Sequence, residues 1–323
     1  MSSLRNTGRA IVRPLLRFAL TLFAASIIIF ALMRAVPGNP ARVALGVNAT
    51  EEAVDELSSE LGLDRPLLTQ YWEWIKGLFT GSFGQSLSSQ QDITPLVLDR
   101  VQVTLILIGL AMLLALAGAI PVGMWLALRN RTRGADVVSA GTQLGIAVPS
   151  FLLGIILVAI FAVHLGWLPA NGWVPPNQGA GEFIRHLILP VIALAVVQGA
   201  MLTRYVRSAV LDVLHQDYIR TARALGQSPW EALKRHGLRN AALPVLTVAG
   251  VQLTTMVVGA VVIESVFVIP GIGSMLLDAV SVRDLTTVQT LVMLLVAFAL
   301  VVNALTDVTY RFIDPRITAG EKK

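Results

Sequence analysis

The chain has no cysteine and only four lysines, and both shortages exclude kinds of chemistry. Without cysteine there is no disulfide, no iron–sulfur cluster and no cysteine-based zinc site. A Walker A motif needs a lysine directly after a glycine, so that the lysine and the backbone amides together hold phosphates. No lysine here meets that condition, so we expect no nucleotide-binding site on this chain. The four are Lys76, Lys234, Lys322 and Lys323.

Catalytic motifs are equally scarce. No two histidines stand four residues apart, and none belongs to an HExxH motif, so no zinc site is expected. Neither a G-x-S-x-G elbow nor an intramembrane Ser-Lys pair occurs. We therefore expect no catalytic residue, no bound metal and no cofactor on this chain, and we do not expect it to be an enzyme. The histidines are His164, His186, His215 and His236.

Charge is also scarce, at 14% of residues, whereas hydrophobic residues make up 55% and the mean hydropathy is +0.71. These values are typical of a membrane protein. Six apolar runs are each long enough to cross about 30 Å of hydrocarbon as a helix, which takes about 20 residues. The sequence predicts an all-α, polytopic membrane protein with six transmembrane helices, at 12–33, 101–128, 137–165, 187–208, 245–269 and 287–310.

Two of these runs contain a proline, Pro121 in the second and Pro149 in the third. A transmembrane helix tolerates proline where its neighbours satisfy the freed carbonyl groups. The first run is long, has no small-x-small cleavage site before Pro37 and is followed by further runs, so we expect a retained span and not a signal peptide.

The basic residues are distributed unevenly. With both termini in the cytoplasm, the segments on that side carry 18 of the 25 Lys and Arg, whereas residues 35–99 carry three bases against nine acids. The positive-inside rule therefore places the N-terminus, the C-terminus and a polar insert at 212–244 in the cytoplasm. The net charge of +5 is then a signal of topology, and we expect no nucleic-acid partner.

This topology divides the chain into five parts. They are a cytoplasmic N-terminal segment at 1–11, a first transmembrane helix at 12–34, an extracytoplasmic loop with short amphipathic helices at 35–100, a five-helix core that includes the insert at 101–312, and a cytoplasmic tail at 313–323.

The extracytoplasmic loop is expected to contain two helices. Thr50 is a good N-cap for a helix over 51–60 that ends near Gly62. A second helix is expected to begin near Pro66 and to carry the aromatic residues Tyr71, Trp72 and Trp74. Aromatic side chains commonly anchor such a helix at the lipid interface.

The insert at 212–244 reads DVLHQDYIRTARALGQSPWEALKRHGLRNAALP. We expect Asp217 to be the N-cap of a short helix that runs through Leu225, with Gly226 as its C′ residue. On this helix Tyr218, Ala222 and Leu225 are spaced to form a small apolar ridge. Seven basic residues lie in or just before the insert: Arg204, Arg207, Arg220, Arg223, Lys234, Arg235 and Arg239. Such a surface suits a docking partner, and an ordinary solvated loop is the alternative.

A second helix should follow directly. Ser228 is expected as its N-cap, Pro229 as its first residue and Glu231 as the partner of Ser228 in a capping box. We expect Gly237 to end this helix.

Polar residues within the spans are costly in lipid and usually face protein or water. They are candidates for lining a translocation pathway, and hydrogen bonding between helices is the alternative. Glu264 in particular precedes Pro270, where it could hold an external gate or simply clamp a loop. The candidates are Gln143, Gln198, Gln252, Glu264, Asn303 and Asp307.

The stretch DYIRTARALG, followed by LRNAALP, resembles the EAA-type loop of ATP-binding-cassette (ABC) importer permeases, and more narrowly the membrane subunits of dipeptide, oligopeptide and nickel importers. Aligned on Gly226, the EAA triplet falls at 220–222, where only Ala222 matches. Of the I-x-L-P positions only Leu238 is kept. The segments AVPGNPAR, LGLDRPLLTQYWEWIKGLFTGSFGQSL and VVIESVFVIPGIGSMLLDAV also resemble this branch, as does the terminal DPR.

The resemblance implies a type I ABC importer permease fold in a prokaryotic inner membrane. It also implies three kinds of partner: a second permease subunit, two ATPase subunits that bind ATP and Mg²⁺, and an extracytoplasmic solute-binding protein. The loop at 35–100 would then form part of the platform for that binding protein.

In this family the short helix of the insert docks on an ATPase. The resemblance therefore implies docking roles for nine residues: Asp217, Tyr218, Arg220, Thr221, Ala222, Arg223, Ala224, Leu225 and Gly226. ATP-driven closure of the ATPases would move this helix and, through it, the spans. Peptides are the expected cargo, and nickel or another small solute is the alternative.

A self-sufficient secondary carrier is the competing class. Such carriers often show an inverted repeat and ionisable groups at the membrane midplane. We find no repeat here, and the membrane-embedded acids are few. A membrane-bound scaffold or enzyme is a third possibility, for which no catalytic constellation is present.

Overall fold

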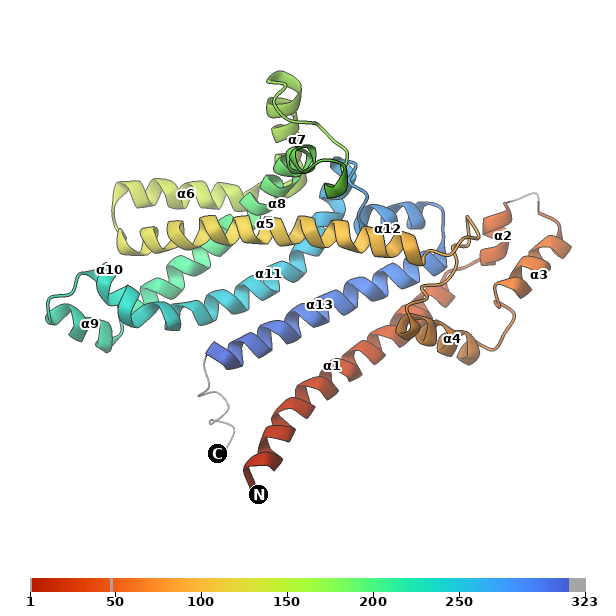
Figure 1. The fold of residues 1–323 in the computed structure, drawn as a ribbon, viewed down its shortest axis with the longest axis horizontal. Coiled ribbons are helices and arrows are strands. Elements are labelled where there is room, and N and C mark those ends of the chain that lie inside the picture. The colour runs from red at the N-terminus through yellow and green to blue at the C-terminus, as the bar shows by residue number, and fades with distance from the viewer. Residues whose placement is uncertain (1, 47–48, 314–323) are drawn as a thin grey trace. The chain divides into compact units, whose positions relative to one another are not determined.

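The computed structural model describes residues 2–46 and 49–313 (Figure 1), and within those ranges the chain is helical, with one isolated β-bridge between Gln85 and Asp92. The helices are α1 (Ser2–Ala35), α2 (Pro40–Leu45), α3 (Glu51–Glu60), α4 (Leu67–Thr80), α5 (Thr94–Leu128), α6 (Arg133–Ala147), α7 (Ser150–Leu157), α8 (Ala180–Leu214), α9 (Asp217–Ala224), α10 (Pro229–Ala232), α11 (Leu238–Val266), α12 (Ile272–Ser281) and α13 (Leu285–Ile313). Two π-helical segments, Val158–His164 and Leu233–Gly237, extend α7 and join α10 to α11, and Pro176–Gln178 is a 3₁₀ turn.

Five of the described helices are long and apolar enough to cross a membrane, and a sixth candidate is a bent pair of helices. The prediction of an all-α polytopic membrane protein is therefore confirmed. The five are Leu16–Ala35, Thr94–Leu128, Ala180–Leu214, Pro229–Val266 and Leu285–Thr309, and the bent pair is Arg133–Ala147 with Ser150–His164.

The two prolines singled out from the sequence behave differently. Pro121 lies inside α5, which continues through it. At Pro149 the third span breaks, and the two halves meet at 100°. Val148 has an extended backbone with ψ 121°, as the residue before a proline prefers, so the helix ends there and restarts after Pro149. The third run is thus two helices and not one straight span.

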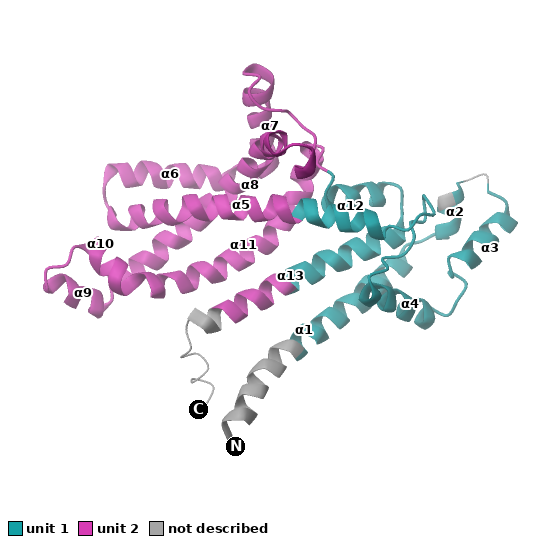
Figure 2. Ribbon diagram, viewed as in Figure 1, with its two compact units in different colours: residues 1–104, 270–300 teal, residues 105–269, 301–323 magenta. Residues whose placement is uncertain are grey.

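The chain forms two compact units (Figure 2). Unit 1 comprises residues 1–104 and 270–300, and unit 2 comprises 105–269 and 301–323. Within unit 2, α8 is the central helix and packs against α6, α7 and α11. Gly123 of α5 lies so close to α8 that a Cβ atom there would be 2.7 Å from Val206. Small residues thus let the helices of unit 2 approach closely, as is usual in membranes.

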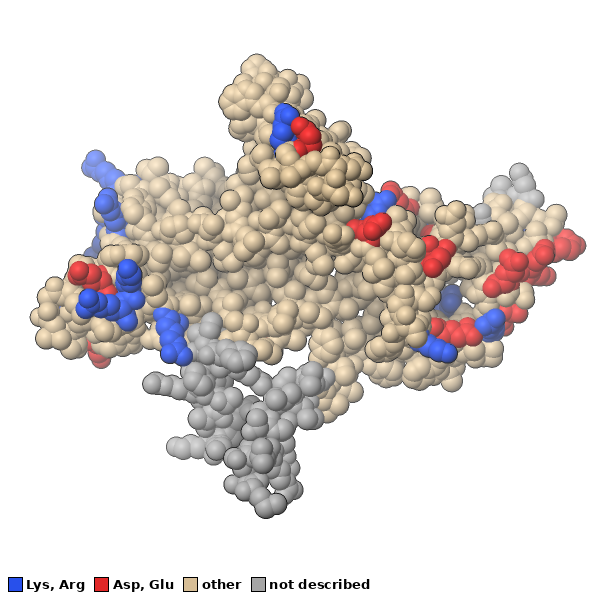
Figure 3. Space-filling model, viewed as in Figure 1, with Lys and Arg blue, Asp and Glu red and all other residues tan. Residues whose placement is uncertain are grey.

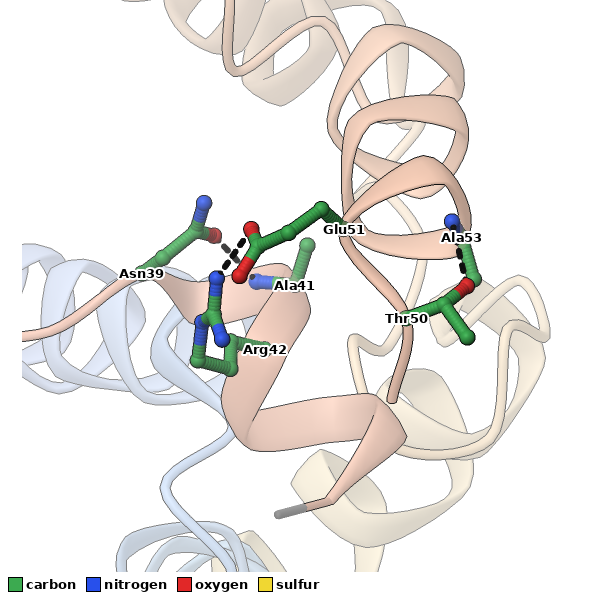
Figure 4. Close-up of polar contacts among 6 residues, drawn as sticks. All are labelled: Asn39, Ala41, Arg42, Thr50, Glu51 and Ala53. Carbon is green, nitrogen blue, oxygen red and sulfur yellow. Dashed lines mark hydrogen bonds and ion pairs between the residues drawn. The ribbon is translucent and has the colours of Figure 1, made fainter. Parts of the chain in front are cut away.

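The segment between α1 and α5, in unit 1, contains the expected capped helix. Thr50 is the N-cap of α3, and its side chain accepts from the amide of Ala53 (Figure 4). An ion pair between Arg42 of α2 and Glu51 of α3 joins the two helices. The hydrogen bond from Arg42 lowers the pKa of the Glu51 carboxyl below its usual value. Asn39 caps α2 through the Ala41 amide.

The aromatic helix α4 follows Pro66 as expected. Its Tyr71 is buried, with the hydroxyl 2.8 Å from Ser26 Oγ on α1 and the ring edge-on to Phe30 at 5.4 Å. Trp74 stacks on the same phenylalanine, whereas Trp72 is 55% exposed. Tyr71 and Trp74 therefore pack on α1, whereas Trp72 and Phe79, which is 83% exposed, are free to meet lipid.

Asp284 ties the turn before α5 to the start of α13 within unit 1. The carboxylate is buried and accepts hydrogen bonds from Ser86 Oγ (2.5 Å), Leu87 N (3.1 Å) and Thr287 Oγ1 (2.8 Å). It also accepts from the Thr287 amide, and so caps α13. A single carboxylate satisfies four donors from two parts of the chain.

We predict that Asp284→Ala destabilises unit 1, because it leaves buried donors unpaired, at about 1–3 kcal/mol each. A lower Tm in detergent and faster protease cleavage near residues 83–93 are expected. Asp278→Ala, at an exposed position on α12, is the matched control and should leave both unchanged. Equal melting of the two variants would contradict the role given to Asp284.

Candidate docking surface

The polar insert folds as α9, α10 and the π-helical turn after α10. Charged side chains gather over α9 and α10, as they do over α2 to α4, whereas the long helices present mostly uncharged surface on the face seen in Figure 3. We refer to the exposed side of residues 217–230 as the α9 surface.

The start of α9 differs by one residue from the prediction. Gln216, with an extended backbone, is the N-cap, and Asp217 is the first helical residue. Asp217 therefore does not cap the helix through its side chain. Its negative charge still lies in the first turn, where it interacts favourably with the helix dipole. The carboxylate is also 3.5 Å from the guanidinium of Arg220, in an exposed ion pair.

The end of α9 is as predicted. Gly226 follows the C-cap Leu225 with φ +92°, the left-handed conformation that glycine adopts without strain. The Gln227 amide donates to the Ala222 carbonyl (3.2 Å), and the Gly226 amide donates to the Arg223 carbonyl (3.0 Å). This pair of bonds is the Schellman motif, which sets the direction in which the chain leaves α9.

The predicted capping box of α10 is also confirmed. Ser228 Oγ accepts from the Glu231 amide, and the Glu231 carboxylate accepts from the Ser228 amide at 2.9 Å. Pro229 occupies the first helical position, where its missing N–H is not needed.

The prediction for Gly237 was wrong. The helix does not end there but continues through the π-helical segment Leu233–Gly237 into α11, so that Pro229–Val266 forms one long helix. A Cβ atom at Gly237 would be 2.6 Å from Val213 and 2.9 Å from Leu233 side-chain carbons. Glycine is required at this position because α8 packs against it.

Ala222 does not belong to an exposed ridge with Tyr218 and Leu225. It is 6% exposed, and together with Ile219, which is fully buried, it packs into an apolar cluster with Val213, Leu233 and neighbouring residues. Residues three apart share a helix face, so this pair forms the inner side of α9. The sequence analysis overlooked Ile219, although its spacing from Ala222 was the available signal.

The outer side of α9 is mixed apolar and basic. Leu225 is 79% exposed and Tyr218 40%, and Trp230 of α10 adds a third exposed apolar side chain. The Tyr218 hydroxyl accepts a hydrogen bond from Asn240 Nδ2 at 2.8 Å, which fixes the ring against the start of α11. The other exposed candidates are Asp217, Arg220, Thr221, Arg223, Ala224 and Gly226. This is the composition of a protein-docking surface.

The polar residues of the spans fall into two groups. Gln252 is buried, donates to Met201 Sδ and accepts from Thr255 Oγ1, so it is an interhelical hydrogen-bonding residue. Glu264 is fully buried, and Gln198 is half-buried with an Oε1 that has no partner among the described residues. The remaining candidates are exposed on their helices: Gln143, Asn303 and Asp307.

About two thirds of the chain has the fold of ABC importer permeases. An inward-facing structure of the MetNI methionine ABC transporter superposes with a TM-score of 0.58 at 20% identity, covering 69% of this chain and 98% of that one. An amino acid ABC transporter crystallised with histidines superposes with a TM-score of 0.52 at 17% identity, covering 68% and 94%.

Sequence comparison gives the family. Residues 119–319 match the binding-protein-dependent transport system inner membrane component, and residues 8–108 match the N-terminal component of the same systems. The chain belongs to this family and is a multi-pass inner-membrane protein.

Two relatives match over nearly their whole length. A probable peptide ABC transporter permease protein, y4tP of Sinorhizobium fredii, is 37% identical, covering 96% of this chain and 99% of the relative. The oligopeptide transport system permease protein AppB of Bacillus subtilis is 35% identical, covering 95% and 98%.

We predict that Gly237→Ala loosens the insert, because the new methyl group meets Val213 and Leu233. Faster protease cleavage between residues 212 and 240 and a lower Tm are expected, since overpacking typically costs about 1–3 kcal/mol. The control is Gly141→Ala on α6, where a Cβ atom meets nothing within 4 Å. Identical behaviour of the two variants would contradict the packing role of Gly237.

Proposed function

We propose that this chain is the membrane-spanning permease subunit of an ABC importer for peptides. Similarity over nearly the full length of relatives named as peptide permeases supports the cargo. The family of inner-membrane transport components supports the role as permease. A nickel or other small-solute importer is the second candidate, favoured only by the shared loop motifs.

The importer would contain three further kinds of subunit. A second permease would complete the pathway, two ATPases would supply the power stroke with ATP and Mg²⁺, and an extracytoplasmic protein would deliver the solute. The excess of basic residues in the insert supports a cytoplasmic α9 surface and cytoplasmic termini. The acidic segment 35–99 would then face the binding protein.

Coupling would act through the α9 surface. An ATPase groove would receive the exposed Leu225 and Tyr218, with Arg220 and Arg223 at the rim. Because the inner side of α9 packs against α8 and the start of α11, closure of the ATPases would move both spans together. The ATPases must contact this surface differently in their open and closed states, since equal binding to both would shift nothing.

Gln252 and Glu264 are the buried candidates for the pathway or its gate, and Gln198 is a half-buried one. Glu264 is the foremost among them because it is fully buried. Gln143, Asn303 and Asp307 are exposed on their helices, where the second permease subunit would cover them.

We predict that Leu225→Asp abolishes peptide uptake while leaving membrane insertion and Tm intact, because it puts a charge into the docking contact without touching the buried side of α9. Uptake of labelled dipeptide into proteoliposomes and co-purification of ATPase activity are the measurements. Gln216→Asp introduces the same charge at the exposed N-cap, where aspartate is favourable, and should behave as wild type.

Wild-type uptake in the Leu225→Asp variant would remove the docking assignment. Wild-type chain that transports without any ATP-hydrolysing partner would instead favour a secondary carrier. Saturation of the cognate binding protein by nickel and not by dipeptides would overturn the cargo and leave the permease role in place.

A further inference from the structure

Unit 1 contains a polar pocket that the transport mechanism above does not use. It lies between the end of α1, the α3–α4 segment, the turn at 82–87 and the start of α13, and its volume is about 360 Å³. Small-molecule sites commonly range from about 300 to 1,000 Å³, so the pocket is large enough for a small solute. Among its lining residues are Arg34, Glu60, Gln70, Trp74 and Gln289.

Three of these lining residues have buried polar atoms without a hydrogen-bond partner within the described ranges. They are Arg34 Nε and Trp74 Nε1, which are donors, and Gln70 Oε1, which is an acceptor. Buried polar groups are almost always paired with protein, water or ligand, so three unpaired atoms around one pocket call for an occupant.

The orientation of Gln70 is fixed by its surroundings. The residue is only 9% exposed, and its Nε2 donates to the carbonyls of Leu63 (3.1 Å) and Arg65 (2.7 Å). A reversed amide would set Oε1 against two carbonyl oxygens, which is unfavourable. The side chain therefore presents a positioned acceptor that can take an N–H or O–H from an occupant.

Arg34 provides a cation without a counter-ion. No carboxylate of the described chain forms an ion pair with it, whereas Glu73, at the same pocket, is paired with Arg65 at 2.7 Å. The guanidinium carbon lies 5.1 Å from the centre of the Phe30 ring, which holds the group in place. A half-buried, positioned guanidinium is well suited to a carboxylate, which it can bind through two hydrogen bonds.

We propose that this pocket binds a small solute that carries a carboxylate beside an N–H donor, namely a free amino acid or a short peptide. The carboxylate would take the donors of Arg34 and Trp74, and the N–H group would donate to Gln70 Oε1. The exposed carboxylate of Glu60 would face a free ammonium group. None of the pathway candidates named above is among its lining residues, and the inference does not require that the chain transports peptides.

The test is equilibrium dialysis of the purified full-length chain, in nanodiscs of phosphatidylcholine, against labelled alanine and labelled Ala-Ala. Saturable binding of one probe at one site per chain is expected, and the comparison of the two probes identifies the solute. If the dipeptide is bound, its C-terminal amide should bind at least about tenfold more weakly, because it lacks the charge that pairs with Arg34.

Two variants test the residues. Arg34→Gln should weaken binding at least about tenfold through loss of the charge. Trp74→Phe should weaken it several-fold, since it removes the donor and keeps an aromatic ring against Phe30 and Tyr71. The matched control is Arg42→Gln, an arginine of the same unit that lies outside the pocket and should bind as wild type. If Arg34→Gln does not fold, the binding measured for Trp74→Phe tests the proposal by itself.

The proposal is overturned if the folded wild-type chain shows no saturable binding of either probe. It is also overturned if Trp74→Phe, and Arg34→Gln where that variant folds, bind the probe as tightly as the wild type does. Displacement of the bound probe by an equal concentration of inorganic phosphate would reduce the site to a general anion site, and would also overturn it. Uptake is measured separately in the full importer. Binding with no uptake would contradict the proposed function alone, and uptake with no binding would contradict this inference alone.

Discussion

Ile219 and Ala222 hold the inner side of α9 in an apolar cluster with the end of α8 and the start of the α10–α11 helix. A helix of eight residues is not stable by itself in water, where isolated helices need about 12–15 residues to be even marginally formed. The burial of these two side chains, together with the Schellman bonds at Gly226, gives α9 its structure. It also determines which residues point outward, because the buried pair fixes one side of the helix and leaves the other positions exposed.

The continuity of the helix from Pro229 to Val266 gives this packing a mechanical consequence. If α10 ended in a flexible loop at Gly237, a force on the α9 surface would be lost before it reached a span. Instead Gly237 lies in helical backbone against Val213, so α8 and α11 meet directly beneath α9. π-Helical turns are often retained at functional sites in spite of their poorer geometry. Here the turn allows one helix to pass from the docking surface into the membrane without a break.

Most features that depend on neighbouring residues could be predicted from the sequence, although the start of α9 was placed one residue too late. Features that depend on distant residues could not be predicted. The cap at Thr50, the capping box at Ser228 and the left-handed Gly226 each involve residues within about five positions of one another. The hydrogen bond between Ser86 and Asp284 joins residues 198 positions apart, and no local sequence pattern predicts it. Gly237 was misread for the same reason, since its requirement comes from Val213 on another helix. Ala222 was assigned to a ridge by spacing alone, although burial of Ile219 turns that face inward.

The positions of glycine in this chain also depend on both local backbone conformation and contacts with distant residues. Helix ends usually favour glycine in the left-handed conformation, yet the residue after the C-cap is Val268 at φ +52° for α11 and Arg283 at φ +57° for α12. The left-handed conformation costs a residue with a side chain roughly 1–2 kcal/mol, and β-branched valine is among the least suited to it. Both ends are held by backbone bonds, from Ile269 N to Glu264 O and from Asp284 N to Ala279 O, each 2.8 Å long. Glycine does take the left-handed conformation after α9, at Gly226. It is also found where α5 and α8 approach, and where Gly250 of α11 meets Thr306 of α13. A membrane protein gains little from apolar attraction between helices in lipid, so close backbone approach must supply the packing, and only glycine permits it there.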